Sequence, residues 1–85
     1  MSKPLHFTAH AKTVILERQL EFDWIERTVR NPDWSESDPS GLPTERRFGR
    51  IPEREDRILR VICLESETEI RIITAFLDRN ARMPR

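Results

Sequence analysis

Three strand-like runs follow one another in the second half of the chain, and their short connections constrain how they can pair. The runs cover residues 45–51, 57–65 and 69–77, and they are rich in isoleucine, valine and phenylalanine, which favour strands. Only residues 52–56 and 66–68 separate them, whereas a parallel crossover needs about a dozen residues or more. The sequence therefore predicts an antiparallel β-meander.

Two helices are predicted ahead of the meander. Apolar residues recur at helical spacing over residues 9–19, directly after Thr8, which is a favourable N-cap residue. A second helix is predicted over residues 22–31, with acidic residues early and arginines late, the order that complements the helix dipole. It ends before Pro32, because proline disfavours helical geometry in the residue that precedes it. Residues 33–43 are rich in proline, serine and aspartate and are expected to form a loop.

Residues 4–7 are short and extended, so the predicted order is strand, helix, helix, strand, strand, strand. This order predicts an α+β fold in which two N-terminal helices pack on one face of a four-stranded, mostly antiparallel sheet. At 85 residues the chain has room for one small core. We expect a single domain over residues 1–85, with its core in residues 8–79 and a basic tail in residues 80–85.

The sheet face that points away from the helices is expected to be partly apolar. Strict alternation in the last run places Ile70, Ile72, Thr74 and Phe76 on one face and Arg71, Ile73, Ala75 and Leu77 on the other. Neither face is then wholly polar, which favours a partner such as a second copy in a homodimer. Alternatively, the tail or the loop around Trp34 covers this face.

Charge and hydropathy exclude several classes of protein. Fifteen basic residues balance fifteen acidic ones, which argues against a protein that coats nucleic acid indiscriminately. No apolar stretch approaches the roughly 20 residues of a membrane-spanning helix, and no signal-peptide core opens the chain. We therefore expect a cytoplasmic protein without membrane association.

Metal and cofactor sites also lack their usual residues. His6, His10 and Cys63 do not provide the clustered ligands that a metal site needs. Gly41 and Gly49 alone cannot build a glycine-rich phosphate loop. We therefore expect no metal and no cofactor, and Cys63, which lies in an apolar run, is expected in the core.

Thirteen of the fifteen basic residues are arginines, whose planar donors suit phosphate and carboxylate groups. Those on the first two strand-like runs are Arg46, Arg47, Arg50, Arg57 and Arg60. Cleavage of RNA by its own 2′-hydroxyl needs a base, an acid and cations near phosphorus, but no metal. His10 is the candidate base, because histidine titrates near neutral pH. The alternative is a solvated face in which neighbouring carboxylates neutralise the arginines.

Short motifs along most of the chain, from Thr8 to Arg79, carry a family resemblance. Thr8, His10 and Ala11, then Glu17 to Leu20, Asn31-Pro32, Arg60 to Ile62 and Ile70 to Thr74 resemble the small bacterial proteins of domain-of-unknown-function family 4258. Arg18 to Phe22, Glu45 to Arg47, Leu59 to Ile62 and Arg71 to Ala75 are similar to BrnT-type ribonuclease toxins, whose fold belongs with RelE-like toxins.

The resemblance implies a RelE-like fold and, for the toxin branch, RNA cleavage that a cognate antitoxin protein relieves. By matching position it implies roles for Lys12, Arg18, Glu45, Arg47 and Arg71. The chain departs from the pattern in three places. Glu17-Arg18 stands where a basic dipeptide is expected, Gln19 where a glycine is expected, and Phe76 to Arg79 where a basic run is expected.

Two functions follow from these observations. The first is a toxin-like, metal-independent endoribonuclease of a bacterial toxin–antitoxin pair, in which arginines gathered in one concavity anchor RNA and His10 or Glu45 handles protons. Its catalytic candidates are His10, Arg18, Glu45 and Arg47, and its RNA-binding candidates are Lys12, Arg46, Arg50, Arg60, Arg71 and Arg79. The second is a non-catalytic protein-interaction module of the same fold, which binds a protein through the open sheet face and the acidic region of the second helix.

Overall fold

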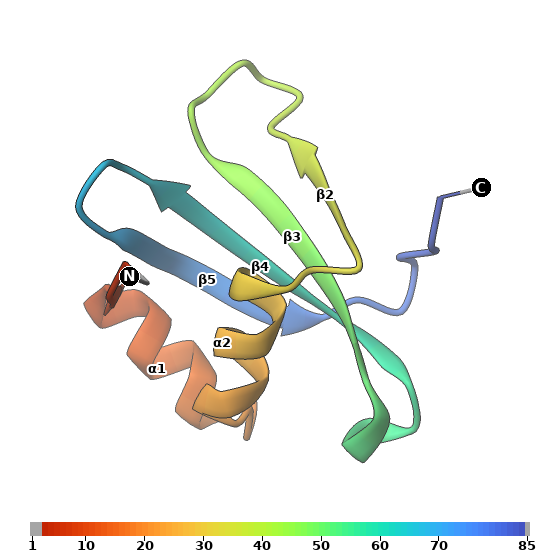
Figure 1. Cartoon of the computed structure of the whole chain (residues 1–85). Helices are drawn as coiled ribbons and strands as arrows, with labels where there is room; N and C mark the ends of the chain where they lie inside the picture. Colours follow the sequence, from red (N-terminus) through yellow and green to blue (C-terminus); the bar gives the residue numbers. More distant parts are fainter. Residues whose placement is uncertain (1–2, 85) are drawn as a thin grey trace.

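The computed structural model describes residues 3–84. Its elements are β1 (Leu5–Phe7), α1 (Ala9–Glu17), α2 (Phe22–Arg30), β2 (Trp34–Ser37), β3 (Glu45–Ile51), the 3₁₀ helix Pro52–Arg54, β4 (Arg57–Glu65) and β5 (Ile70–Leu77) (Figure 1). The strands form one mixed sheet in the order β1-β5-β4-β3-β2. Strand β1 runs parallel to β5, and the other three pairs are antiparallel.

The predicted α+β architecture and the predicted meander are confirmed. Both helices lie on one face of the twisted sheet (Figure 1), and β3 and β4 have their predicted bounds. The predicted strand count is wrong, because the sheet has five strands and not four. The additional strand, β2, lies within the predicted loop and pairs with β3 from Trp34↔Phe48 to Ser37↔Glu45.

Helix α1 ends two residues before its predicted end, and the way it ends fixes the position of Arg18. Gln19 has a left-handed φ of 55°. Its N–H donates to the carbonyl of Leu16 at 3.2 Å, and the N–H of Leu20 donates to that of Ile15 at 2.9 Å. This is a Schellman ending, in which glycine is preferred at the left-handed position. The resemblance leads us to expect glycine at position 19, and the left-handed φ at this position explains why glycine is favoured there. Helix α2 likewise ends one residue early, at Arg30.

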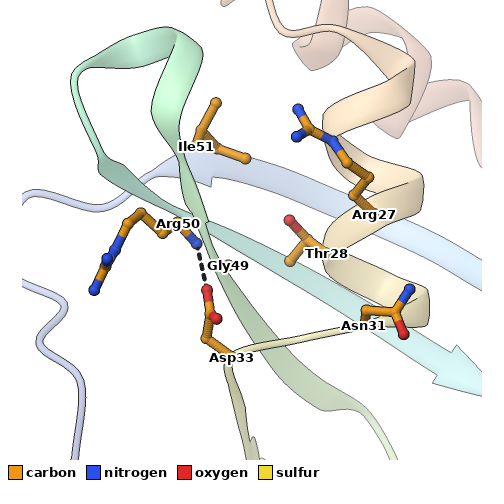
Figure 2. A pocket seen from close by; sticks show the side chains of 7 residues that line it. All are labelled: Arg27, Thr28, Asn31, Asp33, Gly49, Arg50 and Ile51. Atoms are coloured by element: carbon orange, nitrogen blue, oxygen red, sulfur yellow. Dashed lines mark hydrogen bonds between the residues drawn. The ribbon is translucent and has the colours of Figure 1, made fainter.

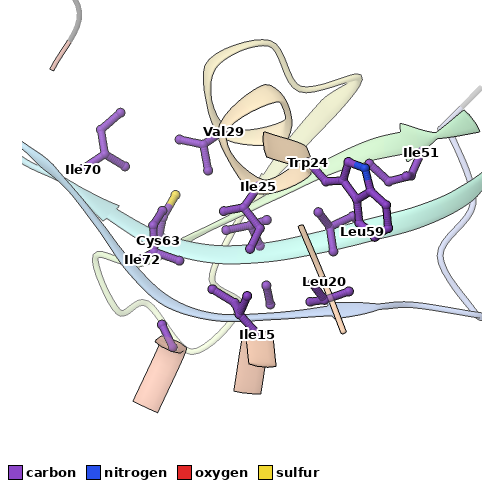
Figure 3. Close-up of a cluster of buried hydrophobic side chains, with 13 residues drawn as sticks. Ile15, Leu20, Trp24, Ile25, Val29, Ile51, Leu59, Cys63, Ile70 and Ile72 are labelled. Carbon is purple, nitrogen blue, oxygen red and sulfur yellow. The ribbon is translucent and has the colours of Figure 1, made fainter. Parts of the chain in front are cut away.

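The core fills the space between the two helices and the sheet (Figure 3). Ile15 of α1 and Ile25 of α2 are fully buried with Leu59, Val61 and Ile72 of the sheet. The prediction for Cys63 is confirmed, since it is a member of this cluster. Burial raises the pKa of its thiol to about 11, so the side chain is neutral at physiological pH.

A bulge in β5 overturns the predicted alternation of that strand. Ile62 pairs with Thr74, but the next residue, Cys63, pairs with Ile72, so Ile73 is an extra residue. An inserted residue reverses the facing of everything that follows it. Ala75 and Leu77 therefore pack with the helix-side core rather than on the opposite face as predicted. Phe76 lies instead on the face away from the helices, where it contacts Arg60.

The residues after β5 form no further helix or strand as far as Pro84. Asp78 is hydrogen-bonded to β4, because its N–H donates to the carbonyl of Ile58 at 2.8 Å. Arg85, the last residue of the predicted basic tail, lies outside the described residues. Neither described helix is long and apolar enough to cross a membrane.

Candidate anion-binding site

The four predicted catalytic residues do not meet in the structure. His10 is exposed in the first turn of α1, and Arg18 caps the other end of that helix, eight residues or roughly 12 Å away. The Arg18 guanidinium lies at the outer edge of β5, where Nη1 donates to the carbonyl of Ala75 at 2.7 Å. Glu45 and Arg47 lie on β3, two strand spacings of about 4.8 Å from β5. Strand β4, with the buried Val61, lies between Arg47 and Ala75, whose carbonyl accepts from Arg18.

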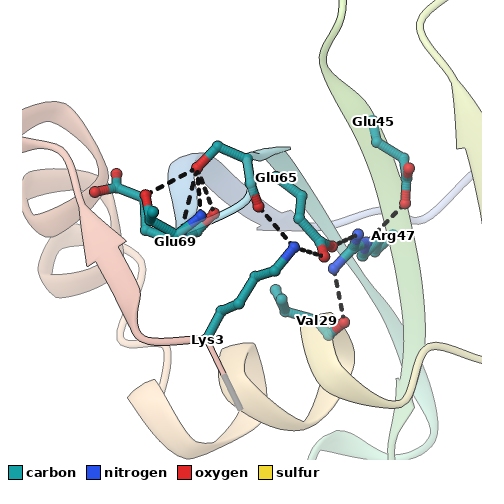
Figure 4. A network of polar contacts seen from close by, with 8 residues as sticks. Lys3, Val29, Glu45, Arg47, Glu65 and Glu69 are labelled. Atoms are coloured by element: carbon teal, nitrogen blue, oxygen red, sulfur yellow. Dashed lines mark hydrogen bonds and ion pairs between the residues drawn. The ribbon is translucent and has the colours of Figure 1, made fainter. Parts of the chain in front are cut away.

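Arg47 is enclosed in a polar network on the helix side of the sheet (Figure 4). Its Nε contacts Glu45 Oε1 at 2.7 Å, its Nη2 contacts Glu65 Oε1 at 2.6 Å, and its Nη1 donates to the carbonyl of Val29 at 3.0 Å. Lys3 Nζ contacts the second oxygen of Glu65 at 2.7 Å. The Arg47 side chain is only 11% exposed. Arg47 therefore joins β3, β4 and the end of α2, and its charge is neutralised by two carboxylates.

The pKa values in this network reflect the ion pairs. Burial lowers the pKa of Arg47, but the hydrogen bonds to Glu65 and Glu45 outweigh that effect and leave it above its usual value. Hydrogen bonds from Arg47 and Lys3 lower the pKa of Glu65 from 4.5 to about 2.

The lowered pKa of Glu65 predicts a loss of stability in acid. A carboxyl group whose pKa is lower in the folded state stabilises the fold above its unfolded pKa, here 4.5, and loses this effect as the pH falls toward about 2. We expect Glu65→Gln to unfold at lower urea concentration than the wild type at neutral pH. The difference in free energy of unfolding between the two proteins should shrink as the pH falls from 4.5 to about 2. Glu67→Gln, an exposed neighbour, is the control. A difference that is independent of pH would contradict this prediction.

The six predicted RNA-binding residues fall into two groups. Three are ion-paired: Arg46 with Glu36 at 3.9 Å, Arg60 with Asp78 at 3.2 Å, and Arg71 with Glu69 at 3.5 Å. Three are exposed and make no ion pair within residues 3–84: Lys12 on α1, Arg50 on β3 and Arg79 after β5. Arg46, Arg50, Arg60 and Arg71 lie on the sheet face away from the helices, whereas Lys12 lies on α1 and Arg79 follows β5, so the structure does not gather all six on one surface.

Aromatic rings and guanidinium groups form a row across the open face of the sheet. Trp34 stacks on Phe48 with ring centroids 4.6 Å apart and planes 6° apart. The Arg60 guanidinium lies 5.5 Å from the Phe48 ring and 5.1 Å from the Phe76 ring, and Arg18 lies 5.8 Å from Phe76 on the far side of the row. Phe48 is consequently only 2% exposed. The region around Trp34 thus covers part of this face, as the second of the two alternatives predicts.

One pocket lies between α2 and β3 and has a volume of about 220 Å³ (Figure 2). The Thr28 hydroxyl beside it is buried and has no partner among the described residues. Arg27 at its rim is paired with Asp23 and Glu53, and the Arg50 guanidinium points away from the other labelled side chains (Figure 2). This pocket therefore offers little free charge to a ligand.

A second pocket, of about 300 Å³, has three arginines in its wall, and we call it the arginine pocket. It is lined by Arg18, Leu20, Arg54, Arg57, Phe76 and Leu77. None of the three arginines forms an ion pair with another described residue, and no described carboxylate lines the pocket. Three positive charges therefore lie around this pocket without a described carboxylate in its wall.

Contacts other than ion pairs hold two of these arginines in place. Arg18 is held by the Ala75 carbonyl, and the Arg54 guanidinium lies 5.7 Å from the Trp24 ring. Arg54 and Arg57 flank Glu55 and Asp56, which both have left-handed φ values, of 58° and 61°. Such conformations are unfavourable for residues other than glycine, and they cluster at functional sites. The turn therefore places two arginines in the wall of one pocket, on either side of two residues with a strained backbone.

The sequence predicts only part of this site. It places Arg18 among the candidate site residues and Arg57 on a strand, but no pattern singles out Arg54. The proximity of α1 to the turn after β3 is a long-range contact that no local pattern reveals. The two consecutive left-handed residues also lack a glycine or asparagine that marks such a turn.

Within residues 3–84 no three histidine, cysteine, aspartate or glutamate side chains gather in a way that could hold a metal ion. No curated protein and no solved structure matches the chain. A family model described as Domain of unknown function (DUF4258) matches residues 7–77, which is most of the chain and agrees with the first of the two resemblances. The chain therefore belongs to the DUF4258 family.

Proposed function

We propose that this chain binds RNA and that Arg18, Arg54 and Arg57 contact the RNA phosphates. The observation that carries the proposal is the arginine pocket, whose three guanidinium groups have no carboxylate partner among the described residues. Guanidinium groups match phosphate oxygens through pairs of parallel hydrogen bonds. Arginines that are held in place before a ligand arrives lose less entropy on binding.

The apolar part of the pocket favours a nucleic acid over a simple anion. Proteins that bind single strands combine cations for the phosphates with aromatic or planar groups that contact the bases. Phe76 lies in the wall of the pocket, and the planar guanidinium of Arg18 lies over it. The proposal agrees with the RNA chemistry that the resemblance of short sequence motifs to BrnT-type ribonuclease toxins implies.

Cleavage is not part of this proposal. None of the described side chains that line the pocket is a histidine or a carboxylate, the usual acids and bases for proton transfer to the 2′-hydroxyl. The predicted toxin-like ribonuclease stays a prediction, and gel analysis of RNA incubated with the protein and a metal chelator tests it directly.

We expect Arg57→Gln to weaken binding of a short single-stranded RNA by about tenfold, since each hydrogen-bonded phosphate contact contributes about 1.5 kcal/mol or more. Fluorescence anisotropy of a labelled RNA measures the affinity. The slope of log affinity against log salt should also fall by about 0.7, the value for one lost contact on a single strand.

The matched control is Arg30→Gln, which removes the same charge from an arginine that is paired with Glu26 on α2. It should bind RNA like the wild type, apart from a small general effect of net charge. The proposal fails if the wild type does not bind RNA at low salt, or if the two variants bind equally well.

A further inference from the structure

We infer that the arginine pocket takes a terminal phosphate monoester, at the 5′ end of an RNA strand or on a free nucleotide, in preference to the internal phosphodiesters of a strand. This inference rests on the proposed function for the placement of phosphate in the pocket. It adds the chemical form of that phosphate.

The charge of the pocket favours the monoester. Arg18, Arg54 and Arg57 carry three positive charges, and arginine stays protonated at any physiological pH. An internal phosphodiester carries a single negative charge, whereas a monoester carries between about 1.5 and 2 near neutral pH, because its second pKa is about 6. The terminal group also has three free oxygens to accept hydrogen bonds from three guanidinium groups. A monoester therefore matches both the charge and the number of donors better.

The size of the pocket favours a single nucleotide. A volume of about 300 Å³ is at the lower end of the range for small-molecule sites, which is roughly 300–1,000 Å³. Leu20, Phe76 and Leu77 give the pocket an apolar wall beside the charges. A ligand that extends from the phosphate to a ribose and a base can use both parts.

The surroundings of the pocket leave the phosphate as the group that titrates near neutral pH. Four carboxylates adjoin the three arginines in sequence, and Asp78 lines a neighbouring pocket that Arg57 shares, but none of the five lines the arginine pocket. The four are Glu17, Glu53, Glu55 and Asp56. His6 lies on β1 and His10 in the first turn of α1, away from the turn that carries Arg54 and Arg57. Comparing two RNAs that differ only at the 5′ end at each pH removes any effect of pH that is common to both.

The test compares one short single-stranded RNA with a 5′-phosphate and with a 5′-hydroxyl. We expect the 5′-phosphorylated RNA to bind about tenfold more tightly at about pH 7.5, since the additional charge and oxygens strengthen charge-assisted hydrogen bonds. The preference should shrink at about pH 5.5, below the second pKa of the phosphate, roughly 6. Arg57→Gln should remove the preference, and Arg30→Gln should keep it.

Three competitors identify the source of the monoester. Competition by a 5′-mononucleotide as strong as that by the phosphorylated RNA supports a free nucleotide. Weaker competition by the mononucleotide, with the 5′-phosphate preference intact, supports the end of a strand. Competition by inorganic phosphate as strong as that by the mononucleotide overturns the inference, because the apolar wall would then contribute nothing.

The possible failures of the two proposals are distinguishable. If both RNAs bind equally well and both depend on Arg57, the preference for a monoester is wrong and the proposed RNA binding stands. If neither RNA binds, both proposals are wrong.

Discussion

The Arg47→Met protein is expected to be less stable than the wild type by about 2 to 3 kcal/mol, measured by urea unfolding at neutral pH. Methionine keeps the unbranched apolar stem, so the loss comes from the polar contacts and not from a cavity. The carbonyl of Val29 loses its donor, and Glu45 and Glu65 lose the cation between them. Breaking a fully buried pair costs about 3 to 5 kcal/mol. The loss expected for Arg47→Met is smaller than this, because both carboxylates are partly exposed and can be hydrated.

Arg46→Met is the matched control for this prediction. Arg46 precedes Arg47 on β3 but points to the opposite face, and its one ion pair, with Glu36, has a separation of 3.9 Å. Such a pair contributes at most about 1 kcal/mol. If Arg47→Met were as stable as Arg46→Met, the network of Figure 4 would not have the structural role assigned to it. At temperatures where it remains folded, Arg47→Met should bind RNA like the wild type.

Gly49→Ala is expected to destabilise the protein by about 2 kcal/mol through overpacking between α2 and β3. A Cβ atom at position 49 would lie 2.7 Å from Oγ1 and 3.2 Å from Cγ2 of Thr28. Thr28 is only 2% exposed and has little room to move. The effect is steric, because alanine is otherwise at least as favourable as glycine inside a strand. Thermal or urea unfolding measures it.

Thr28→Ala should rescue part of this loss, since it removes the two closest atoms and leaves Thr28 Cβ, at 3.3 Å from the new methyl group. We expect the Gly49→Ala, Thr28→Ala double variant to be more stable than Gly49→Ala alone by about 1 kcal/mol, a coupling typical of residues in contact. Gly41→Ala, which has a positive φ and open space around it, is a control that separates backbone strain from crowding. Additive effects of the two substitutions would contradict the steric explanation.

The sequence predicts most of the fold because the relevant signals are local. Short connections determine the meander, Thr8 marks the start of α1, and Pro32 limits α2. Strand β2 escaped prediction because it is a polar edge strand in which only Trp34 is substantially buried, so it shows no apolar alternation. The bulge at Ile73 cannot be seen in the composition of the strand. It reverses the sheet face to which Phe76 and the two residues beside it point.

The candidate site was less predictable, because it depends on which arginines have partners. The abundance of arginine favours anionic ligands, but which arginines are free depends on the fold: Arg47 and Glu65 become partners only through the pairing of β3 with β4. Register of this kind is set by the whole sheet and not by neighbouring residues. Arg18 lies in the arginine pocket only because the Schellman ending of α1 turns the chain beside the edge of β5.

Phosphate binding in the arginine pocket can be followed through the Nε–Hε NMR signals of the arginines while a 5′-phosphorylated single-stranded RNA is added. We expect the signals of Arg18, Arg54 and Arg57 to shift as the RNA saturates the protein. The signals of Arg30 and Arg47, which are already paired with carboxylates, should stay in place. If saturation with RNA moves the signals of the paired arginines and leaves those of the arginine pocket unchanged, the arginine pocket is not the phosphate site.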